Sequence, residues 1–432
     1  MTRMGLATRN AWGAVLCALV IGCWVFLYDD ASSTGTAVLG GYRERWFLLC
    51  SLVTYGCLLY WLIALSRPGK AALGRMLLLH LGIALSLAIL EVPAFLGNID
   101  YRDVFGRQVG HRAAGGKLAD PRLSRTGRPN VRFQGTSLPD LAGLLGAEAS
   151  PIPVDFQTDA YGLRNKSTKT DPGIFFLGDS VLVAGLVPID SIVSERVEKL
   201  LGIAVLNVSE VGYSPQEELI RLEALGLPLQ DKLVVHFIFE GNDLSDSMRW
   251  RARSNRSASS AWPESGFMKS LLRTLHRPKR TAGRERSGHF VTAAEDDQEV
   301  YFLYDSRRID ACIDEFSFIA RAMQGAARKI LDEGGSYAVV FIPTKIRVLH
   351  GFCTWPEGSG LSDPQLAQSS MFSRLAQACE EAGIPLLDLT PSLVAASGEG
   401  RLAFFAADTH LNAVGHEVMA NALGPWITAL QR

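Results

Sequence analysis

The stretch IFFLGDSV, residues 174–181, decides how the rest of the chain is interpreted. Ile174 to Leu177 is a short apolar run typical of a buried parallel strand, and Gly178 allows a tight turn that a larger residue would resist. Ser180 therefore follows a strand, just before a helix can begin. Open α/β folds hold their active sites at this edge of the sheet, so the Ser180 hydroxyl is a candidate nucleophile. Taken alone, Gly-Asp-Ser also suits a plain turn with a helix cap.

Strands and helices alternate from Gly173 to the end of the 432-residue chain. The sequence predicts strands at 174–177, 204–208, 233–239, 337–342 and 384–389. Helical patterns occur at about 188–201, 215–225, 309–333, 366–382 and 412–430. This alternation predicts a three-layer α/β/α sandwich with a five-stranded parallel sheet, in which the carboxyl ends of all strands share one edge.

Three further segments bring reactive or hydrogen-bonding residues to that edge. Gly212 lies in the loop beyond the second strand, and Asn242 lies in the Gly-Asn-Asp loop beyond the third. Asp408 and His410 stand two residues apart just before the last helix. A nucleophile, a base, an acid that orients the base and candidate oxyanion donors are the parts that acyl transfer requires.

These ordered blocks make residues 158–432 resemble the SGNH/GDSL hydrolase superfamily, whose fold is flavodoxin-like. The blocks are Gly178-Asp179-Ser180, Gly212, Gly241-Asn242-Asp243 and Asp408-Thr409-His410. TDAYGLRN at 158–165 and IPTK at 342–345 also resemble bacterial members with membrane-attached amino termini. Many members have Asp-x-x-His, whereas this chain has Asp-x-His, as in the branch that resembles alginate O-acetyltransferases. The acyl acceptor, water or a sugar hydroxyl, is therefore left open.

The chemistry assigns a role to each block. Ser180 attacks an ester carbonyl, His410 transfers the proton, and Asp408 fixes the histidine tautomer. The backbone N–H groups of Ser180 and Gly212 and the side-chain amide of Asn242 are the predicted oxyanion donors. Asp179 is expected to be structural, with its side chain directed away from that of Ser180. No cofactor and no metal are expected.

The amino-terminal region contains long apolar runs at 11–28, 46–65 and 76–96, each close to the roughly 20 residues of a membrane-spanning helix. Arg3 and Arg9 before the first run, and Lys70 and its basic neighbours between the second and third, place these segments in the cytoplasm. Residues 1–97 are thus expected to form a multi-pass anchor in a bacterial inner membrane, with the catalytic domain outside. An alternative is that Cys23 ends a lipoprotein signal peptide.

Two other segments complete the predicted organisation. Residues 98–157 have little periodicity and are predicted to be a linker, and residues 247–290 form a basic insertion in the catalytic domain. The insertion is either a solvated segment or a surface that binds an anionic polymer or lipid head groups. Two of the three cysteines Cys312, Cys353 and Cys379 could form a disulfide in an oxidising compartment, but their spacing does not indicate which two.

The functional expectation is a membrane-anchored extracytoplasmic serine esterase that acts on O-acyl groups, chiefly O-acetyl, of envelope carbohydrate. One alternative is an O-acetyltransferase that needs a separate membrane partner as acyl donor. Others are a non-catalytic glycan-binding module and a lipase-like esterase. The net charge of −1 gives no indication of nucleic acid as a partner.

Overall fold

The structure is a computed structural model, and it describes residues 14–22, 53–57, 59, 70–96, 115–116, 122–124, 126–144, 149–254, 266–268, 271 and 286–431. The chain divides into two compact units. One is formed by Met1–Arg107 and Trp262–Lys279, and the other, which carries the predicted triad, by Gln108–Ala261 and Arg280–Arg432. Each unit is described by itself.

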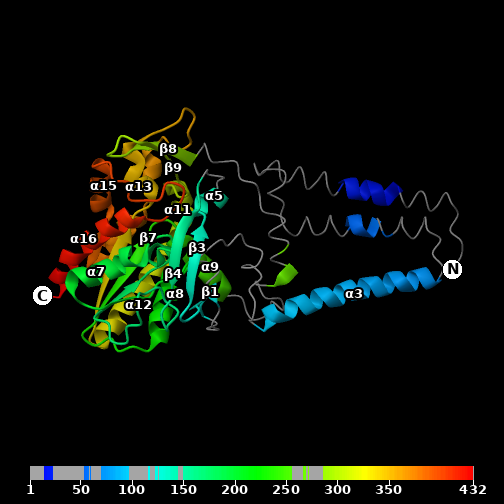
Figure 1. The fold of residues 1–432 in the computed structure, drawn as a ribbon, viewed down its shortest axis with the longest axis horizontal. Helices are drawn as coiled ribbons and strands as arrows, with labels where there is room; N and C mark the ends of the chain where they lie inside the picture. Colours follow the sequence, from blue (N-terminus) through cyan, green and yellow to red (C-terminus); the bar gives the residue numbers. More distant parts are fainter. Residues whose placement is uncertain are drawn as a thin grey trace. The chain divides into compact units, whose positions relative to one another are not determined.

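A five-stranded parallel sheet forms the centre of the second unit (Figure 1). Its strands are β5 (Ile174–Leu177), β6 (Val205–Asn207), β7 (Leu233–Phe239), β10 (Ser336–Ile342) and β12 (Leu386–Asp388), in the order β12-β10-β7-β5-β6. The sheet confirms the predicted fold class. Each predicted strand is present, with small differences at the ends of β6, β10 and β12.

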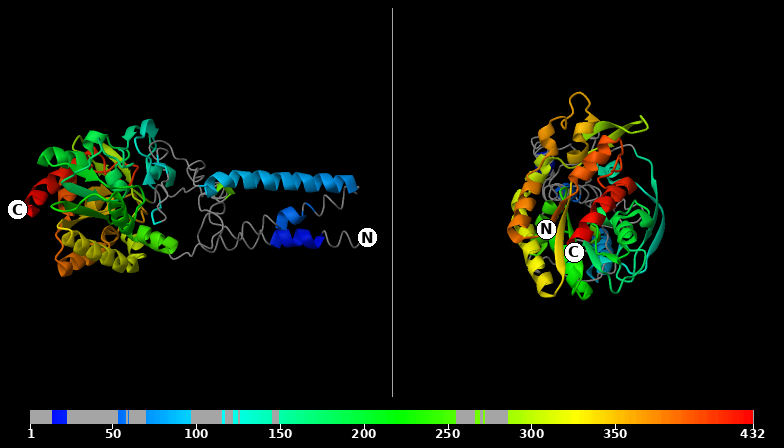
Figure 2. Two further views of the ribbon diagram at one scale, coloured as in Figure 1. Left: turned by 90° about the horizontal axis from the view of Figure 1, so that it is seen from below. Right: turned by 90° about the vertical axis from the view of Figure 1, so that its left-hand side faces the viewer.

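Helices cover both faces of the sheet, so that it lies between two layers (Figure 2). Side chains of β5 alternate between the two faces: Phe176 packs in one hydrophobic core, and Phe175 and Leu177 pack in the other. One layer contains α7 (Val193–Leu201), α13 (Lys345–Leu349), α15 (Thr390–Gly398) and α16 (Ala413–Leu430). The other contains α8 (Pro215–Leu225), α12 (Phe316–Asp332) and α14 (Met371–Ala382). Burial on both faces explains why the strands are continuous apolar runs.

Several helix boundaries differ from the predictions. The pattern at 309–333 is divided into α11 (Ser306–Asp310), a 3-10 turn at Ile313–Glu315, and α12. Helix α15 has no counterpart among the predicted helices. The segment predicted as a basic insertion begins within α9 (Asp243–Ser254) and ends within β8 (Ser287–Val291), which pairs with β9 (Asp297–Tyr301) and with β11 (Cys353–Thr354). Most of its middle lies outside the described residues.

Part of the predicted linker is folded, which corrects that prediction. Strand β3 (Arg132–Ser137) pairs antiparallel with β4 (Ile152–Gln157), and the short helix α5 (Asp140–Leu144) lies between them in the chain. Two-residue strands β1 (Gly115–Gly116) and β2 (Thr126–Gly127) also pair. Val154 and Phe156 of β4 are buried in a small core with Val183 and Leu186, so this segment belongs to the catalytic unit.

The first unit contains helix α3 (Lys70–Phe95), which overlaps the third predicted span. Most residues of the first two predicted spans lie outside the described part of the chain. Among the described residues, no helix reaches both the length and the apolarity needed to cross a bilayer, so the three spans are not confirmed. The buried carboxylate of Glu91 in α3 accepts hydrogen bonds from the backbone N–H groups of Phe267 and Met268.

Candidate active site

Ser180 is the first residue of the short helix α6 (Ser180–Val183), directly after β5. Asp179 caps this helix, because its carboxylate accepts the backbone N–H of Val181 at 2.9 Å. A Cβ atom added at Gly178 would lie 2.6 Å from a methyl carbon of Leu182, so the turn between strand and helix requires glycine. The local sequence thus places the Ser180 hydroxyl at the carboxyl edge of the sheet, as predicted.

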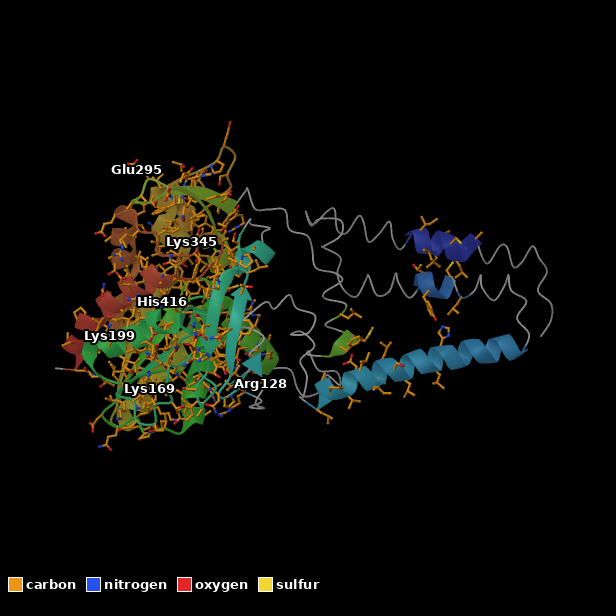
Figure 3. The ribbon with its side chains drawn as sticks, viewed as in Figure 1. Arg128, Lys169, Lys199, Glu295, Lys345 and His416 are labelled. Carbon is orange, nitrogen blue, oxygen red and sulfur yellow. The ribbon has the colours of Figure 1, made fainter. Side chains whose placement is uncertain are left out.

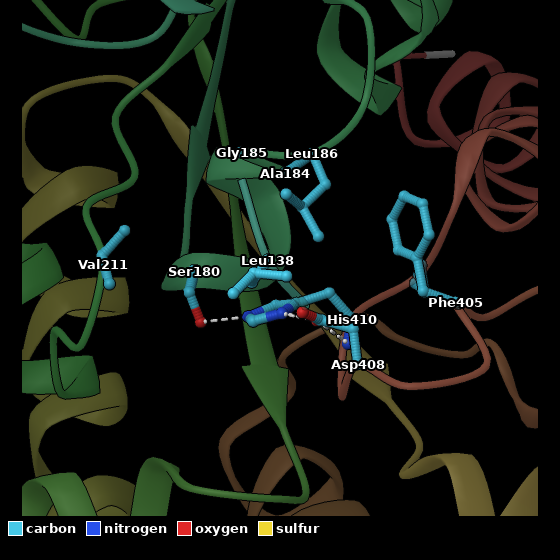
Figure 4. A pocket seen from close by; sticks show the side chains of 10 residues that line it. Leu138, Ser180, Ala184, Gly185, Leu186, Val211, Phe405, Asp408 and His410 are labelled. Carbon is cyan, nitrogen blue, oxygen red and sulfur yellow. Dashed lines mark hydrogen bonds and ion pairs between the residues drawn. The ribbon is translucent and has the colours of Figure 1, made fainter. Parts of the chain in front are cut away.

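The three predicted triad residues meet in one line of hydrogen bonds (Figure 4). The Nε2 atom of His410 lies 2.8 Å from Ser180 Oγ, and its Nδ1 atom lies 2.5 Å from Asp408 Oδ1. The backbone N–H of His410 donates to the same carboxylate oxygen at 3.0 Å, which closes a turn between the two residues. This is the geometry in which histidine removes the serine proton and aspartate orients the histidine.

The charges in the site favour a charged Asp408 and a charged His410. Burial alone would raise the pKa of Asp408, but the charge and hydrogen bond of His410 and two backbone N–H groups hold that pKa well below its usual range. Burial alone would lower the pKa of His410, but Asp408, with help from Asp140 and Asp179, raises it above the ordinary histidine value. Asp408 can therefore stabilise the imidazolium that forms when Ser180 is deprotonated.

The predicted oxyanion donors lie in loops at the same edge, and their role stays a prediction. The Nδ2 atom of Asn242 donates to Asp179 at 3.0 Å and to Asp246 at 2.7 Å, so both amide hydrogens are used inside the protein. Gly212 adopts a left-handed conformation, with a φ of 72°, directly after Val211, which lines the cavity beside Ser180.

Asp179 does not point away from the nucleophile, contrary to our expectation. Its Oδ2 atom lies 3.3 Å from Ser180 Oγ and also accepts from Asn242. The helix cap explains this orientation, because a carboxylate that reaches the N–H of Val181 turns back over the start of α6.

A small cavity of about 20 Å³ opens beside Ser180 (Figure 4). Most of its wall is apolar. The lining side chains include Leu138 before α5, Leu186 after α6, Val211 after β6 and Phe405 before α16. A cavity of this volume holds about one group the size of a water molecule. A short acyl group fits this volume.

Arg164 of the TDAYGLRN segment holds one wall of that cavity. Its side chain is fully buried, and its guanidinium donates to the backbone carbonyls of Val183, Ala184 and Val187. The guanidinium also lies over the ring of Phe156, 5.0 Å from its centroid. Burial lowers the pKa of Arg164 to about 9, so it remains charged at neutral pH. The sequence motif therefore has a structural role beside the site.

Lys345 of the IPTK segment holds the loop that carries Asp408 and His410. Its side chain is buried within the catalytic unit (Figure 3), and its Nζ atom donates to the carbonyls of Tyr301, Phe405 and Ala406 at 2.9, 2.7 and 3.0 Å. Burial lowers the pKa of Lys345 to about 8. Sequence reasoning noted the motif but assigned this residue no role.

One cluster of the described residues, Asp140, Asp408 and His410, brings three candidate metal-ligand atoms within 4.8 Å of one another. Oxygens of both carboxylates and the Nδ1 atom of His410 take part in hydrogen bonds within this network. We therefore assign the cluster to the triad rather than to a metal. The three cysteines whose pairing was open, Cys312, Cys353 and Cys379, are free thiols.

Comparison with known families agrees with this geometry. Residues 312–431 match the family model described as the SGNH hydrolase-like domain of the acetyltransferase AlgX. This part of the chain is thus similar to an SGNH hydrolase-like domain. The matched region includes Asp408 and His410, and it begins after Ser180 in the chain. With the triad assembled as described, the chain is a serine esterase or acyltransferase whose site is similar to that of the SGNH class.

Solved structures with a related arrangement are esterases and acylhydrolases. An esterase from Pseudoalteromonas sp. is 12% identical and aligns over 60% of this chain and 98% of its own, with a TM-score of 0.32. The acetyl xylan esterase AlAXEase is 13% identical and aligns over 59% of this chain and 98% of its own, with a TM-score of 0.33. Phospholipase A1 from Streptomyces albidoflavus is 12% identical and aligns over 59% of this chain and 99% of its own, with a TM-score of 0.34. At these scores the likenesses decide nothing about substrate. No curated protein sequence matches this chain.

Proposed function

We propose that this SGNH enzyme is a membrane-anchored, extracytoplasmic esterase that cleaves O-acetyl groups from an envelope carbohydrate. The observation that carries the proposal is the cavity of about 20 Å³ beside Ser180, which has room for little more than an acetyl methyl group. The match to an acetyltransferase domain supports the same acyl group. The resemblance to alginate-acetylating proteins supports a carbohydrate.

Enlarging the cavity should change acyl-chain selectivity. Leu186→Ala removes part of the apolar wall, so we expect the ratio of kcat/KM for an aryl butyrate to that for the aryl acetate to rise by about 10-fold. The control is Leu331→Ala, since that leucine is 70% exposed on α12. A native enzyme that hydrolyses butyrate as fast as acetate would contradict the proposal for an acetyl-sized site.

The carbohydrate part of the proposal is tested by acetate release. Purified full-length protein should release acetate from an O-acetylated polysaccharide and should leave a phospholipid in mixed micelles intact. The Ser180→Ala protein serves as the blank for both substrates. Fatty-acid release without acetate release would support the lipase-like alternative and overturn the proposal.

A second candidate function is transfer of the acetyl group to a sugar hydroxyl. The match to an acetyltransferase domain favours it, and both reactions pass through the same acyl-enzyme on Ser180. Because three spans are few for carrying an activated acyl group across a membrane, a transferase would need a membrane partner as donor. Incubation with aryl acetate and an unacetylated oligosaccharide distinguishes the two, because a transferase gives an acetylated sugar in preference to free acetate.

The membrane anchor rests on the apolar runs at 11–28, 46–65 and 76–96 and on their basic flanks. Side chains along α3 support it, because Leu81, Leu85 and Ile89 are each at least 60% exposed, and a row of exposed leucine and isoleucine is unfavourable in water.

The proposed topology predicts where reporters are active. A phosphatase reporter fused after residue 98 should be active outside the inner membrane, and one fused after Lys70 should be inactive. The phosphatase is active only in an oxidising compartment. A second reporter that is active only in the cytoplasm should therefore give the opposite result at the same two fusion points. The reverse pattern at the two fusion points would overturn the extracytoplasmic location and, with it, the envelope substrate.

A further inference from the structure

Helix α5 lies directly beside the loop that carries Asp408 and His410. Leu138, two residues before the helix, lines the cavity next to His410 (Figure 4), and the backbone N–H of Leu141 donates to the carbonyl of Ala407 at 3.1 Å. The side chain of Leu141 is fully buried in a small core with Ala407. The start of α5 is therefore packed against the catalytic loop, although it is about 270 residues away in the chain.

Asp140 and the catalytic loop exchange hydrogen bonds in both directions. The backbone N–H of Asp140 donates to Asp408 Oδ2 at 2.7 Å, and that oxygen is the one that His410 does not use. In return, the Asp140 carboxylate accepts the backbone N–H of Thr409 at 3.0 Å and its hydroxyl at 2.6 Å. Both the backbone and the side chain of Asp140 thus contact the segment from Asp408 to His410.

We propose that Asp140 is a positioning residue for the catalytic triad: its backbone N–H fixes the free oxygen of Asp408, and its side chain fixes Thr409 between Asp408 and His410. Asp408 has two oxygens, and rotation about its side-chain bond would misplace the one that orients His410. A donor on the second oxygen prevents that rotation. The inference rests on the triad of the proposed esterase but not on the identity of its glycan.

The Asp140 carboxylate also adds negative charge near His410. Three carboxylates act on His410: Asp408 on its own loop, Asp140 from α5 and Asp179 from the cap of α6. Lys345 of α13 contacts the same loop and interacts with Asp408 and Asp140. The three carboxylates all raise the pKa of His410. Removal of one of them should therefore lower that pKa, which a purely structural role for Asp140 would not do.

Three substitutions separate the two contributions in the full-length protein. Asp140→Asn keeps the shape but removes the charge, Asp140→Ala removes the carboxylate and keeps the N–H, and Asp140→Pro removes the N–H as well. Proline is tolerated in the first turn of a helix, where the backbone N–H has no partner within the helix. Asp332→Asn is the matched control, because Asp332 is exposed at the end of α12.

We expect each Asp140 variant to lower kcat on a small aryl acetate by roughly 10-fold, the size of one charge-assisted hydrogen bond, with KM nearly unchanged. Asp140→Pro should lose more than Asp140→Ala. His410 must be neutral to act as a base, so kcat/KM rises with pH as His410 loses its proton. In Asp140→Asn this rise in kcat/KM should begin at a lower pH than in the native protein. The control should match the native protein in every respect.

A second variant keeps the test decisive if Asp140→Pro does not fold. Thr409→Val removes only the hydroxyl that donates to Asp140, so Thr409→Val and Asp140→Ala together should cost less than the sum of the two single changes. The inference is overturned if Asp140→Ala and Asp140→Asn keep the native kcat and pH profile. Native protein that cleaves the aryl acetate but no O-acetylated polysaccharide would instead overturn the carbohydrate proposal and leave Asp140 unaffected.

Discussion

Ser180→Ala and His410→Ala should each lower kcat on a small aryl acetate by at least about 1,000-fold. The reason is that the two side chains act as a unit: the imidazole lies 2.8 Å from Ser180 Oγ, closer than the Asp179 carboxylate at 3.3 Å, and it is in turn oriented by Asp408. The double variant should therefore be little worse than either single variant. Asp408→Ala should lower kcat by a smaller factor, because His410 remains in place as the base and loses only the residue that orients it.

Initial rates with a chromogenic acetate give this measurement. Ser362→Ala and His289→Ala are matched controls, since Ser362 is exposed, His289 is half-buried and both lie outside the active site. Near-native turnover in His410→Ala would mean that the residue bonded to Ser180 is not the base, and the assignment of the whole site would have to be abandoned. If the control variants also lost hydrolytic activity, the substitutions would have damaged the fold.

Arg164→Met should destabilise the catalytic unit and loosen its acyl site. The substitution removes the donor from the carbonyls of Val183 and Val187, at a cost of about 1 kcal/mol each, or roughly 2 kcal/mol in all, whereas the Ala184 carbonyl still accepts the backbone N–H of Val187. Methionine keeps much of the side-chain volume, so the loss reports on the hydrogen bonds rather than on a cavity. The segment 184–187 contributes to the cavity beside Ser180, and its release should also reduce the preference for acetyl over butyryl esters.

Denaturant unfolding, followed by the fluorescence of the folded unit, measures the stability change. Arg374→Met is the control, because Arg374 is exposed on α14. If Arg164→Met unfolds at the same denaturant concentration as the native protein, the buried guanidinium does not support this loop. A stability loss with unchanged acyl selectivity would remove only the link between Arg164 and the cavity.

The sequence predicted the sheet well because its strands are buried on both faces. Such strands are continuous apolar runs, and Ile174–Leu177 and Leu233–Phe239 were predicted with the bounds that the structure has. The same rule placed Ser180 and Asn242 at one edge, since residues that follow parallel strands meet there. The Asp408–His410 pair was recognised instead by its position just before the last helix. Helix ends were predicted less well, because the start of α11 depends on a local cap, Asp305, rather than on periodicity.

The contribution of the segment before residue 158 could not be predicted. It is rich in glycine, arginine and proline. Ile152, Val154 and Phe156 of β4 do alternate with outward-facing residues, but that pattern does not identify β3 as the partner strand. The contact between Asp140 and Asp408 joins positions 268 residues apart, and only the folded chain brings them together. The one local indication was Pro139-Asp140, a pair typical of a helix start.

The side-chain directions of polar residues were also beyond the sequence. Asp179 was expected to face away from Ser180, but as a helix cap it turns toward Ser180 and engages Asn242. A Gly-Asp-Ser turn fixes which residue follows the strand, whereas the cap fixes where the carboxylate points. The anchor spans remain predictions for a different reason, because most of their residues lie outside the described part of the chain.

Covalent labelling tests the central claim most directly, because it identifies the nucleophile without any assumption about substrate. The full-length protein is treated with a fluorophosphonate probe, digested, and its labelled peptide sequenced by mass spectrometry. The site described here predicts one adduct, on Ser180, that is formed by the native protein, formed slowly by His410→Ala and not formed by Ser180→Ala. An adduct on another serine, or equal labelling of native protein and Ser180→Ala, would contradict it.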